Sequence, residues 1–140
     1  MKRLFHKLIP WKRTIWPATI WSALIFIIQM IPKQNLPEHH QTIAADQVIP
    51  VPYFDKMVHV FLYSILYILC MFFAEKGVLK NRNPLINMAV IFYCFLYGIL
   101  IEYLQLNVGR EFNWHDVWAN GAGIITGIVI YTFLNQHIRS

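Results

Sequence analysis

Four apolar stretches, separated by polar connectors, dominate the pattern of the chain. Each is close to the roughly 20 residues that a helix needs to cross the hydrocarbon core of a membrane, and each holds few charged residues. The pattern therefore predicts an all-α bundle of four transmembrane helices, within one membrane domain that covers residues 1–140. The expected spans are residues 14–31, 54–74, 84–106 and 114–134.

Cap and turn residues support these boundaries. Asn83 followed by Pro84 is typical of a helix start, because Asn caps free N–H groups and Pro is tolerated at the first helical position. Four prolines within residues 32–53 argue against regular structure there and predict a long exposed loop. A basic segment before the first apolar run also fits a signal peptide, but its length, its tryptophans and the lack of a small-residue cleavage site favour a retained helix.

Composition narrows the class of protein. The chain is 57% hydrophobic and 14% charged, whereas an ordinary soluble domain is about 45–50% apolar and about 25% charged. The net charge of +5 would suggest a nucleic-acid partner in a soluble chain. In a membrane protein the basic residues must first be divided between the two sides of the bilayer. We therefore expect an integral membrane protein with no nucleic-acid partner.

The basic residues predict the orientation in the membrane. If the N-terminus is cytoplasmic, nine of the twelve Lys and Arg residues lie on the cytoplasmic side, and Lys33, Lys56 and Arg110 lie on the other. The positive-inside rule selects this arrangement. It places both termini in the cytoplasm, and the 32–53 loop and the 107–115 turn outside. The tryptophans expected in the interfacial belts are Trp11, Trp16, Trp114 and Trp118.

Polar side chains recur at helical spacing near the outward ends of the last three spans. Residues three or four apart share a helix face, so each span offers one polar stripe, and topology brings the three stripes to the same depth. Polar groups within a membrane are costly and indicate a functional site. The stripes are Asp55, His59 and Tyr63 on the second span, Glu102 and Gln105 on the third, and Asp116 and Asn120 on the fourth.

A stripe of small residues on the fourth span predicts close helix packing. Ala119, Gly123 and Gly127 recur every four residues and include a GxxxG motif, which allows a neighbouring helix to approach.

Arg110 lies in the outward turn before the fourth span. The free N–H groups and the dipole at a helix N-terminus favour negative charge, so Arg110 and this helix end are predicted to bind an anion together. The alternative is that Arg110 only anchors the turn at the membrane interface.

The other polar residues also have structural interpretations. Asn113 with Asp116 could cap the fourth helix, and Asp55 could cap the second. His59 and Glu102 lie about one turn inside their helices, where a cap does not explain them. They form either a reactive site or a buried polar network that holds the helices together.

One ordered set of these residues carries a family resemblance: Asp55, Lys56, His59, Tyr63, Glu102, Gln105, Gly109, Arg110, Asp116, Asn120 and Gly123. Their order and spacing resemble the VanZ-like family of small bacterial membrane proteins, over residues 55–127. Asn113 stands where the family favours serine, and either residue can cap a helix. The resemblance implies a cell-envelope context in the bacterial cytoplasmic membrane. The family's namesake is an accessory determinant of resistance to the glycopeptide teicoplanin, and the resemblance does not supply a settled biochemical activity.

Two functional hypotheses follow. In the first, an outward-facing polar cleft binds an anionic envelope component, such as a membrane lipid or a lipid-linked precursor, without turning it over. In the second, the protein is a membrane-embedded enzyme acting on a lipid-linked or peptidoglycan-precursor substrate. There Arg110 holds a phosphate or carboxylate, while His59, oriented by Asp55 or Glu102, moves a proton. The remaining candidate binding residues are Lys56, Tyr63, Gln105, Asp116 and Asn120.

The sequence contains no recognised metal-binding or nucleophile motif. Asp55, His59, Glu102 and Asp116 are potential metal ligands, but the sequence has no HExxH motif or cysteine spacing, so we expect no metal. It also has no GxSxG nucleophile motif. The sequence identifies no cofactor and leaves homo-oligomerisation open. Four short helices would serve poorly as a transporter subunit.

Overall fold

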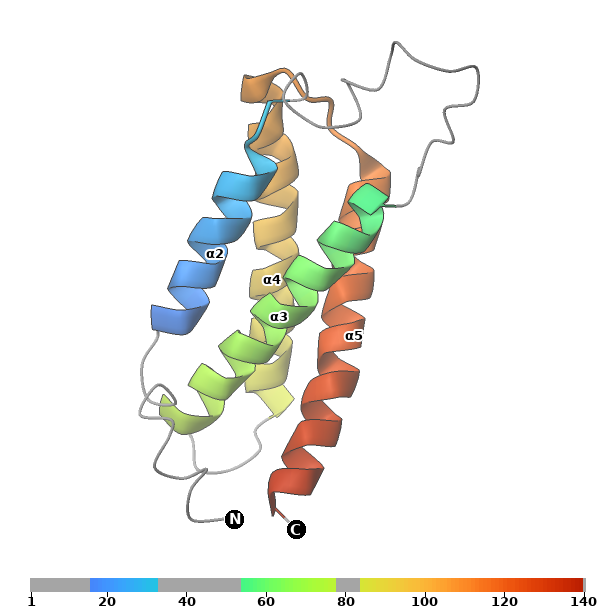
Figure 1. Ribbon diagram of the computed structural model, residues 1–140. Helices are drawn as coiled ribbons and strands as arrows, with labels where there is room; N and C mark the ends of the chain where they lie inside the picture. The colour runs from blue at the N-terminus through green and yellow to red at the C-terminus, as the bar shows by residue number, and fades with distance from the viewer. Residues whose placement is uncertain (1–15, 33–53, 78–83, 140) are drawn as a thin grey trace.

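The computed structural model describes residues 16–32, 54–77 and 84–139. In this part of the chain every regular element is a helix: α2 (Trp16–Gln29), α3 (Phe54–Gly77), α4 (Pro84–Gln105), the short 3-10 helix η4 (Leu106–Val108) and α5 (Trp114–Arg139) (Figure 1). The predicted all-α bundle of four main helices is confirmed. The predicted loop at 32–53 and the connector before Pro84 lie almost entirely outside the described residues.

Three of the helices are long and apolar enough to cross a membrane. Helices α3, α4 and α5 contain 24, 22 and 26 residues. Helix α2 has 14 residues, which at about 1.5 Å per residue span only about 21 Å. Its last residue comes two positions before the end of the predicted span of residues 14–31, because the chain leaves the helix in a turn after Gln29, just before Pro32. Residues 14 and 15 of that span lie outside the described residues.

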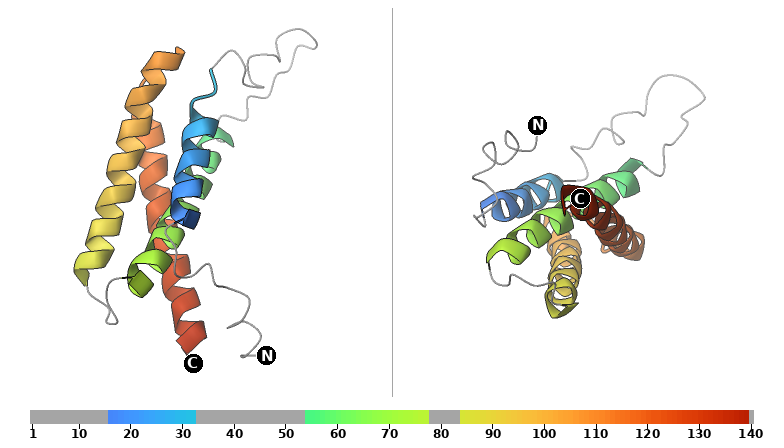
Figure 2. Two further views of the ribbon diagram at one scale, coloured as in Figure 1. Left: turned by 90° about the vertical axis from the view of Figure 1, so that its left-hand side faces the viewer. Right: turned by 90° about the horizontal axis from the view of Figure 1, so that it is seen from below.

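Helix α3 contacts α2, α4 and α5, and its most extensive contact is with α5 (Figure 2). It contributes much of the core, since Leu62, Tyr63, Leu66 and Tyr67 are each at most 4% exposed. Helix α4 presents many large apolar side chains outward instead, including Phe92 and Leu96. An outward apolar face is what a membrane helix offers to lipid, so α4 is placed to face the bilayer.

The contact between α3 and α5 depends on glycine. A Cβ atom at Gly123 would lie 2.6 Å from the Val60 carbonyl oxygen, and one at Gly127 would lie 2.8 Å from the Ser64 carbonyl oxygen. Both distances are below van der Waals contact, so only glycine allows the two backbones to approach this closely. The predicted small-residue packing face is confirmed.

Two hydrogen bonds to backbone carbonyls attach α2 to the bundle. Trp21 Nε1 donates to the Leu62 carbonyl of α3 at 2.9 Å, and the Tyr97 hydroxyl of α4 donates to the Ser22 carbonyl at 2.6 Å. Ile25 of α2 is fully buried. These contacts fix the rotation of α2, so that Gln29 at its end faces the other helices.

Candidate functional site

The predicted polar residues lie together at one end of the bundle. This end is formed by the last turn of α2, the first turns of α3 and α5, and the last turn of α4 (Figure 1). We call the assembly the polar cluster. It contains all nine predicted site residues and one more, Gln29: Gln29, Asp55, Lys56, His59, Tyr63, Glu102, Gln105, Arg110, Asp116 and Asn120.

His59 lies at the centre of the polar cluster and is 2% exposed. Its Nδ1 atom lies 2.9 Å from Asn120 Oδ1 and 3.1 Å from Gln29 Nε2. With the proton on Nδ1, the ring donates to Asn120, the Gln29 amide rotates to present its oxygen, and Nε2 is free to accept a proton. With the proton on Nε2, Nδ1 accepts from Gln29, the Asn120 amide rotates instead, and Nε2 can donate to an anion. His59 of α3 is thus held from two other helices, α2 and α5, through one ring nitrogen.

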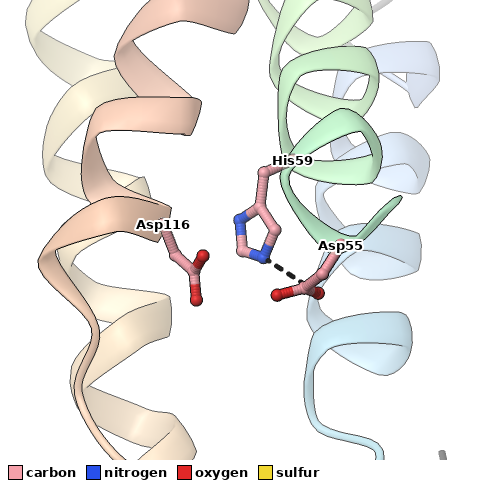
Figure 3. Close-up of side chains that lie close together, drawn as sticks. All are labelled: Asp55, His59 and Asp116. Atoms are coloured by element: carbon pink, nitrogen blue, oxygen red, sulfur yellow. Dashed lines mark ion pairs between the residues drawn. The ribbon is translucent and has the colours of Figure 1, made fainter. Parts of the chain in front are cut away.

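The other ring nitrogen of His59 points toward two carboxylates (Figure 3). His59 Nε2 lies 3.8 Å from Asp55 Oδ1, and the Asp116 carboxylate lies across from it on α5. Lys56 bonds to both acids: its ammonium lies 3.2 Å from Asp55 Oδ2 and forms a short ion pair with Asp116 Oδ1. Nε2 therefore lies on the side of the ring where the charged residues gather.

Arg110 completes this charged side. Its Nη2 atom lies 3.9 Å from Asp55 Oδ1, and its side chain is 13% exposed. The turn that carries it is held by backbone hydrogen bonds, one from the Arg110 N–H to the Gln105 carbonyl at 3.2 Å. Gly109 takes a left-handed conformation at φ 75°, which glycine adopts without strain. The turn thus directs the Arg110 side chain back toward the start of α3.

Several buried polar atoms of the cluster have no hydrogen-bond partner among the described residues. These are both carboxylate oxygens of Glu102, both amide atoms of Gln105, the hydroxyl of Tyr63, Asn120 Nδ2 and Gln29 Oε1. The five residues are at most 3% exposed. The backbone of Asn113 and the charges of Arg110 and Asp116 act on Glu102 electrostatically without forming a regular hydrogen bond. A buried polar group without a partner costs about 1–3 kcal/mol, so these groups call for an explanation.

His59 and Glu102, one of the two acids expected to orient it, lie further apart than a direct hydrogen bond. His59 Nδ1 and Glu102 Oε1 are 3.8 Å apart, which is ion-pair distance but too long for a direct bond. The nearer amides of Asn120 and Gln29 occupy that side of the ring. Glu102 therefore lies close to His59 without bonding to it directly.

A family model described as VanZ/LLP1 matches residues 4–135. The chain belongs to the VanZ/LLP1 family. No curated protein and no solved structure matches it. The match includes α2 and so extends well beyond residues 55–127, where the sequence resemblance was found.

Helix α2, which the longer match includes, contributes a residue to the polar cluster that the sequence analysis did not predict. Gln29 of α2 is 3% exposed and contacts His59. A signal was available, because Gln29 is a polar residue at the C-terminal end of the first apolar run, the depth predicted for the other stripes. Gly98 of α4 was also missed: a Cβ there would lie 3.0 Å from Asn120 Nδ2 and 3.2 Å from the Tyr63 ring. Its lack of a side chain leaves room for both residues.

The structural interpretations hold for some residues of this VanZ/LLP1 protein. Asn113 caps α5, because its Oδ1 atom accepts the His115 N–H at 3.0 Å. The Asp116 side chain pairs with Lys56 instead of capping. His59, Asn120 and Gln29 also connect three helices, so the cluster contributes to packing as well as carrying chemical groups.

Asp55, His59 and Asp116 also form a group with metal-ligand geometry. One potential ligand atom from each lies within 4.8 Å of the others, and Glu102 is not part of this group. The Lys56 ammonium bonds to both carboxylates, so it supplies the positive charge that a metal would otherwise bring. The arrangement fits an internal ion-pair network.

Proposed function

We propose that this VanZ/LLP1 protein binds an anionic component of the cell envelope, a membrane lipid or a lipid-linked precursor, at the polar cluster. The observation that carries the proposal is the convergence of Arg110, Lys56 and His59 Nε2 on one partly exposed position, that of the Asp55 carboxylate. Charge-assisted hydrogen bonds to an anion are about twice as strong as neutral ones. A low-dielectric membrane strengthens them further.

The proposed site faces outward from the cytoplasmic membrane of a bacterium. This orientation rests on the nine-to-three division of Lys and Arg residues. Buried amides of Gln105 and Asn120, and the Tyr63 hydroxyl, have hydrogen-bonding atoms without protein partners and would bind the polar part of the ligand. The Asp116–Lys56 pair would hold the Lys56 ammonium in place. Ligand binding in such a cleft would link the protein to teicoplanin resistance through the envelope component that it holds.

Arg110 provides the test of this proposal. Arg110→Ala in purified protein should lose binding of short-chain phosphatidylglycerol by roughly tenfold or more while the protein stays folded, since a charge-assisted contact contributes about 1.5–3 kcal/mol. Arg110→Lys should recover only part of the affinity, because Lys cannot form the planar two-point contact. Titration calorimetry measures the affinity, and teicoplanin susceptibility of cells carrying each variant gives the cellular readout. Equal binding by wild type and Arg110→Ala would refute the proposal.

A second candidate, an enzyme, is favoured by the way His59 is held. Asn120 and Gln29 contact Nδ1, and Glu102 lies 3.8 Å from the same atom, so Nε2 is left toward the charged side. A histidine held in this way can act as a general base, with Arg110 and Lys56 holding the substrate anion. His59→Gln should then change the envelope-lipid profile of cells relative to wild type. If the lipid profile is unchanged and the variant still binds the headgroup, the enzyme hypothesis is wrong and the protein only binds its ligand.

A further inference from the structure

Asp55 differs from the other acids of the polar cluster in its exposure. Its side chain is 37% exposed, whereas those of Asp116 and Glu102 are 4% and 0% exposed. A carboxylate in contact with solvent can leave its partners at lower cost than a buried one, because water solvates it when it moves. Asp55 is therefore the acid of the cluster best able to move.

The contacts of Asp55 are also loose. His59 Nε2 and Arg110 Nη2 lie 3.8 Å and 3.9 Å from its Oδ1 atom, beyond the 2.7–2.9 Å or so of a charge-assisted hydrogen bond. Its closest partner is the adjacent Lys56 at 3.2 Å, which also bonds Asp116. With a proton on His59 Nε2, three donors thus point at one carboxylate, and two of them, His59 Nε2 and Arg110 Nη2, do not reach it. An anion with oxygens spread more widely than those of a carboxylate could reach all three.

The charges around Asp55 limit what could replace it. Lys56 already has Asp116 as a partner, and Glu102 approaches the other nitrogen of the His59 ring, Nδ1. Within the described residues, the ion pair of Arg110 is with Asp55. A ligand with a single negative charge would therefore keep the balance of charge when it displaced Asp55. A second negative charge would have no matching cation in a poorly solvated site.

The depth of the site indicates where this ligand comes from. Trp114 and Trp118, in the first turns of α5 at the same end of the bundle, are 65% and 74% exposed. Outward-facing tryptophans in a membrane helix lie at the level of the lipid headgroups. The polar cluster therefore lies level with lipid phosphates.

We propose that Asp55 is an internal stand-in for the ligand anion, displaced when the singly charged phosphodiester of a membrane lipid headgroup binds between Arg110, Lys56 and His59 Nε2. The inference rests on the proposed function and deepens it, because it names the class of ligand and the residue that competes with it. A tetrahedral phosphodiester has two free oxygens set apart from its ester oxygens, so it can contact several donors at once. When the lipid binds, the Asp55 side chain turns toward solvent. Before binding, Asp55 occupies the same donors and so lowers the affinity of the site for the lipid.

The experiment compares removal of the Asp55 charge with removal of a matched one. Asp55→Asn should bind dihexanoyl phosphatidylglycerol roughly tenfold more tightly than wild type, which corresponds to about 1.4 kcal/mol. Glu111→Gln removes one negative charge from an exposed residue at the same end of the molecule and should change affinity less than about twofold, as expected for an exposed, screened charge. Titration calorimetry in detergent micelles gives the affinities. Asp55→Ser, which keeps a residue suited to the start of a helix, repeats the test if the Asn variant is unstable.

Binding measurements with three different anions separate the classes of ligand. Dihexanoyl phosphatidic acid, with its second ionisable group, and inorganic phosphate should both bind Asp55→Asn more weakly than phosphatidylglycerol. Inorganic phosphate binding as tightly as the lipid would overturn the assignment to a lipid headgroup. If Asp55→Asn and Glu111→Gln raised the affinity for phosphatidylglycerol equally, the gain would come from removing any negative charge near the site. That result would overturn the stand-in role of Asp55.

The same series distinguishes the two proposals. If wild type binds phosphatidylglycerol in an Arg110-dependent way but neither Asp55 variant binds it more tightly, the stand-in role is wrong and the proposed function stands. If wild type and all variants fail to bind it, both are wrong.

Discussion

At the scale of single residues, Glu102 is the least expected feature of the molecule. Its carboxylate is fully buried and has no regular hydrogen bond, although burying an ionisable group is costly unless it is paired and hydrogen-bonded. Its contact with His59 Nδ1, at 3.8 Å, recovers only part of that cost. A residue that weakens the fold in this way is expected where function requires it.

Replacing Glu102 by its neutral isostere should therefore separate stability from function. Glu102→Gln removes the buried charge while keeping shape, so we expect the protein to unfold at an equal or higher temperature, with a gain of up to about 1–3 kcal/mol. Headgroup binding should fall at the same time, because His59 loses the nearby charge. Thermal unfolding in detergent and the binding titration measure the two effects. Loss of stability together with unchanged binding would show that Glu102 is a packing residue.

At the scale of elements, the pairing of α3 with α5 fixes the geometry of the site. Gly123 and Gly127 bring the α5 backbone against Val60 and Ser64 of α3. Asn120 lies one turn before Gly123 on α5, and His59 directly precedes Val60 on α3. The hydrogen bond between His59 and Asn120 thus depends on a helix contact that the glycines of α5 make possible.

Two glycines of α5 provide a matched test of this contact. Gly123→Ala places a Cβ 2.6 Å from the Val60 carbonyl oxygen and should destabilise the protein by about 1–3 kcal/mol through overpacking. Gly121→Ala, where the added Cβ meets nothing within 4 Å, should be neutral or stabilise by up to about 1 kcal/mol through helix propensity. Thermal unfolding in detergent measures both. The larger Gly123→Leu change should lose folded protein. If Gly123→Ala proved as stable as Gly121→Ala, α3 and α5 would not pack as described.

At the scale of the whole molecule, all ten members of the polar cluster lie at one end of a bundle whose long helices present apolar side chains outward. The direction in which this end faces determines what the site can meet. Its outward orientation remains a prediction from the basic residues, since the apolar helices alone fit either orientation.

Cysteine labelling tests that orientation. A cysteine at Glu111, in the turn at the cluster end, should react with a membrane-impermeant maleimide applied to intact cells. One at Ile138, near the other end of α5, should react only after the membrane is opened. The native Cys70 and Cys94 are buried and should give little background. Labelling of position 138 from outside, with 111 protected, would place the cluster in the cytoplasm and remove the envelope ligand from consideration.

The sequence by itself determined the helices and the polar stripes on them. Hydropathy and helical spacing are local properties, so they show that His59, Glu102 and Asn120 lie near helix ends that topology brings to one side. It also indicated Gly123 and Gly127 as a packing face, since small residues at a spacing of four leave one side of a helix bare.

Only the tertiary structure decided how these residues pair. It added Gln29 to the cluster, paired Lys56 with Asp116, placed Asn120 rather than Glu102 next to His59, and left Asp55 loosely held at the exposed side. These outcomes depend on how each helix is rotated about its axis and how closely it approaches its neighbours. The packing of all the helices together sets both quantities, so no single segment of sequence contains them.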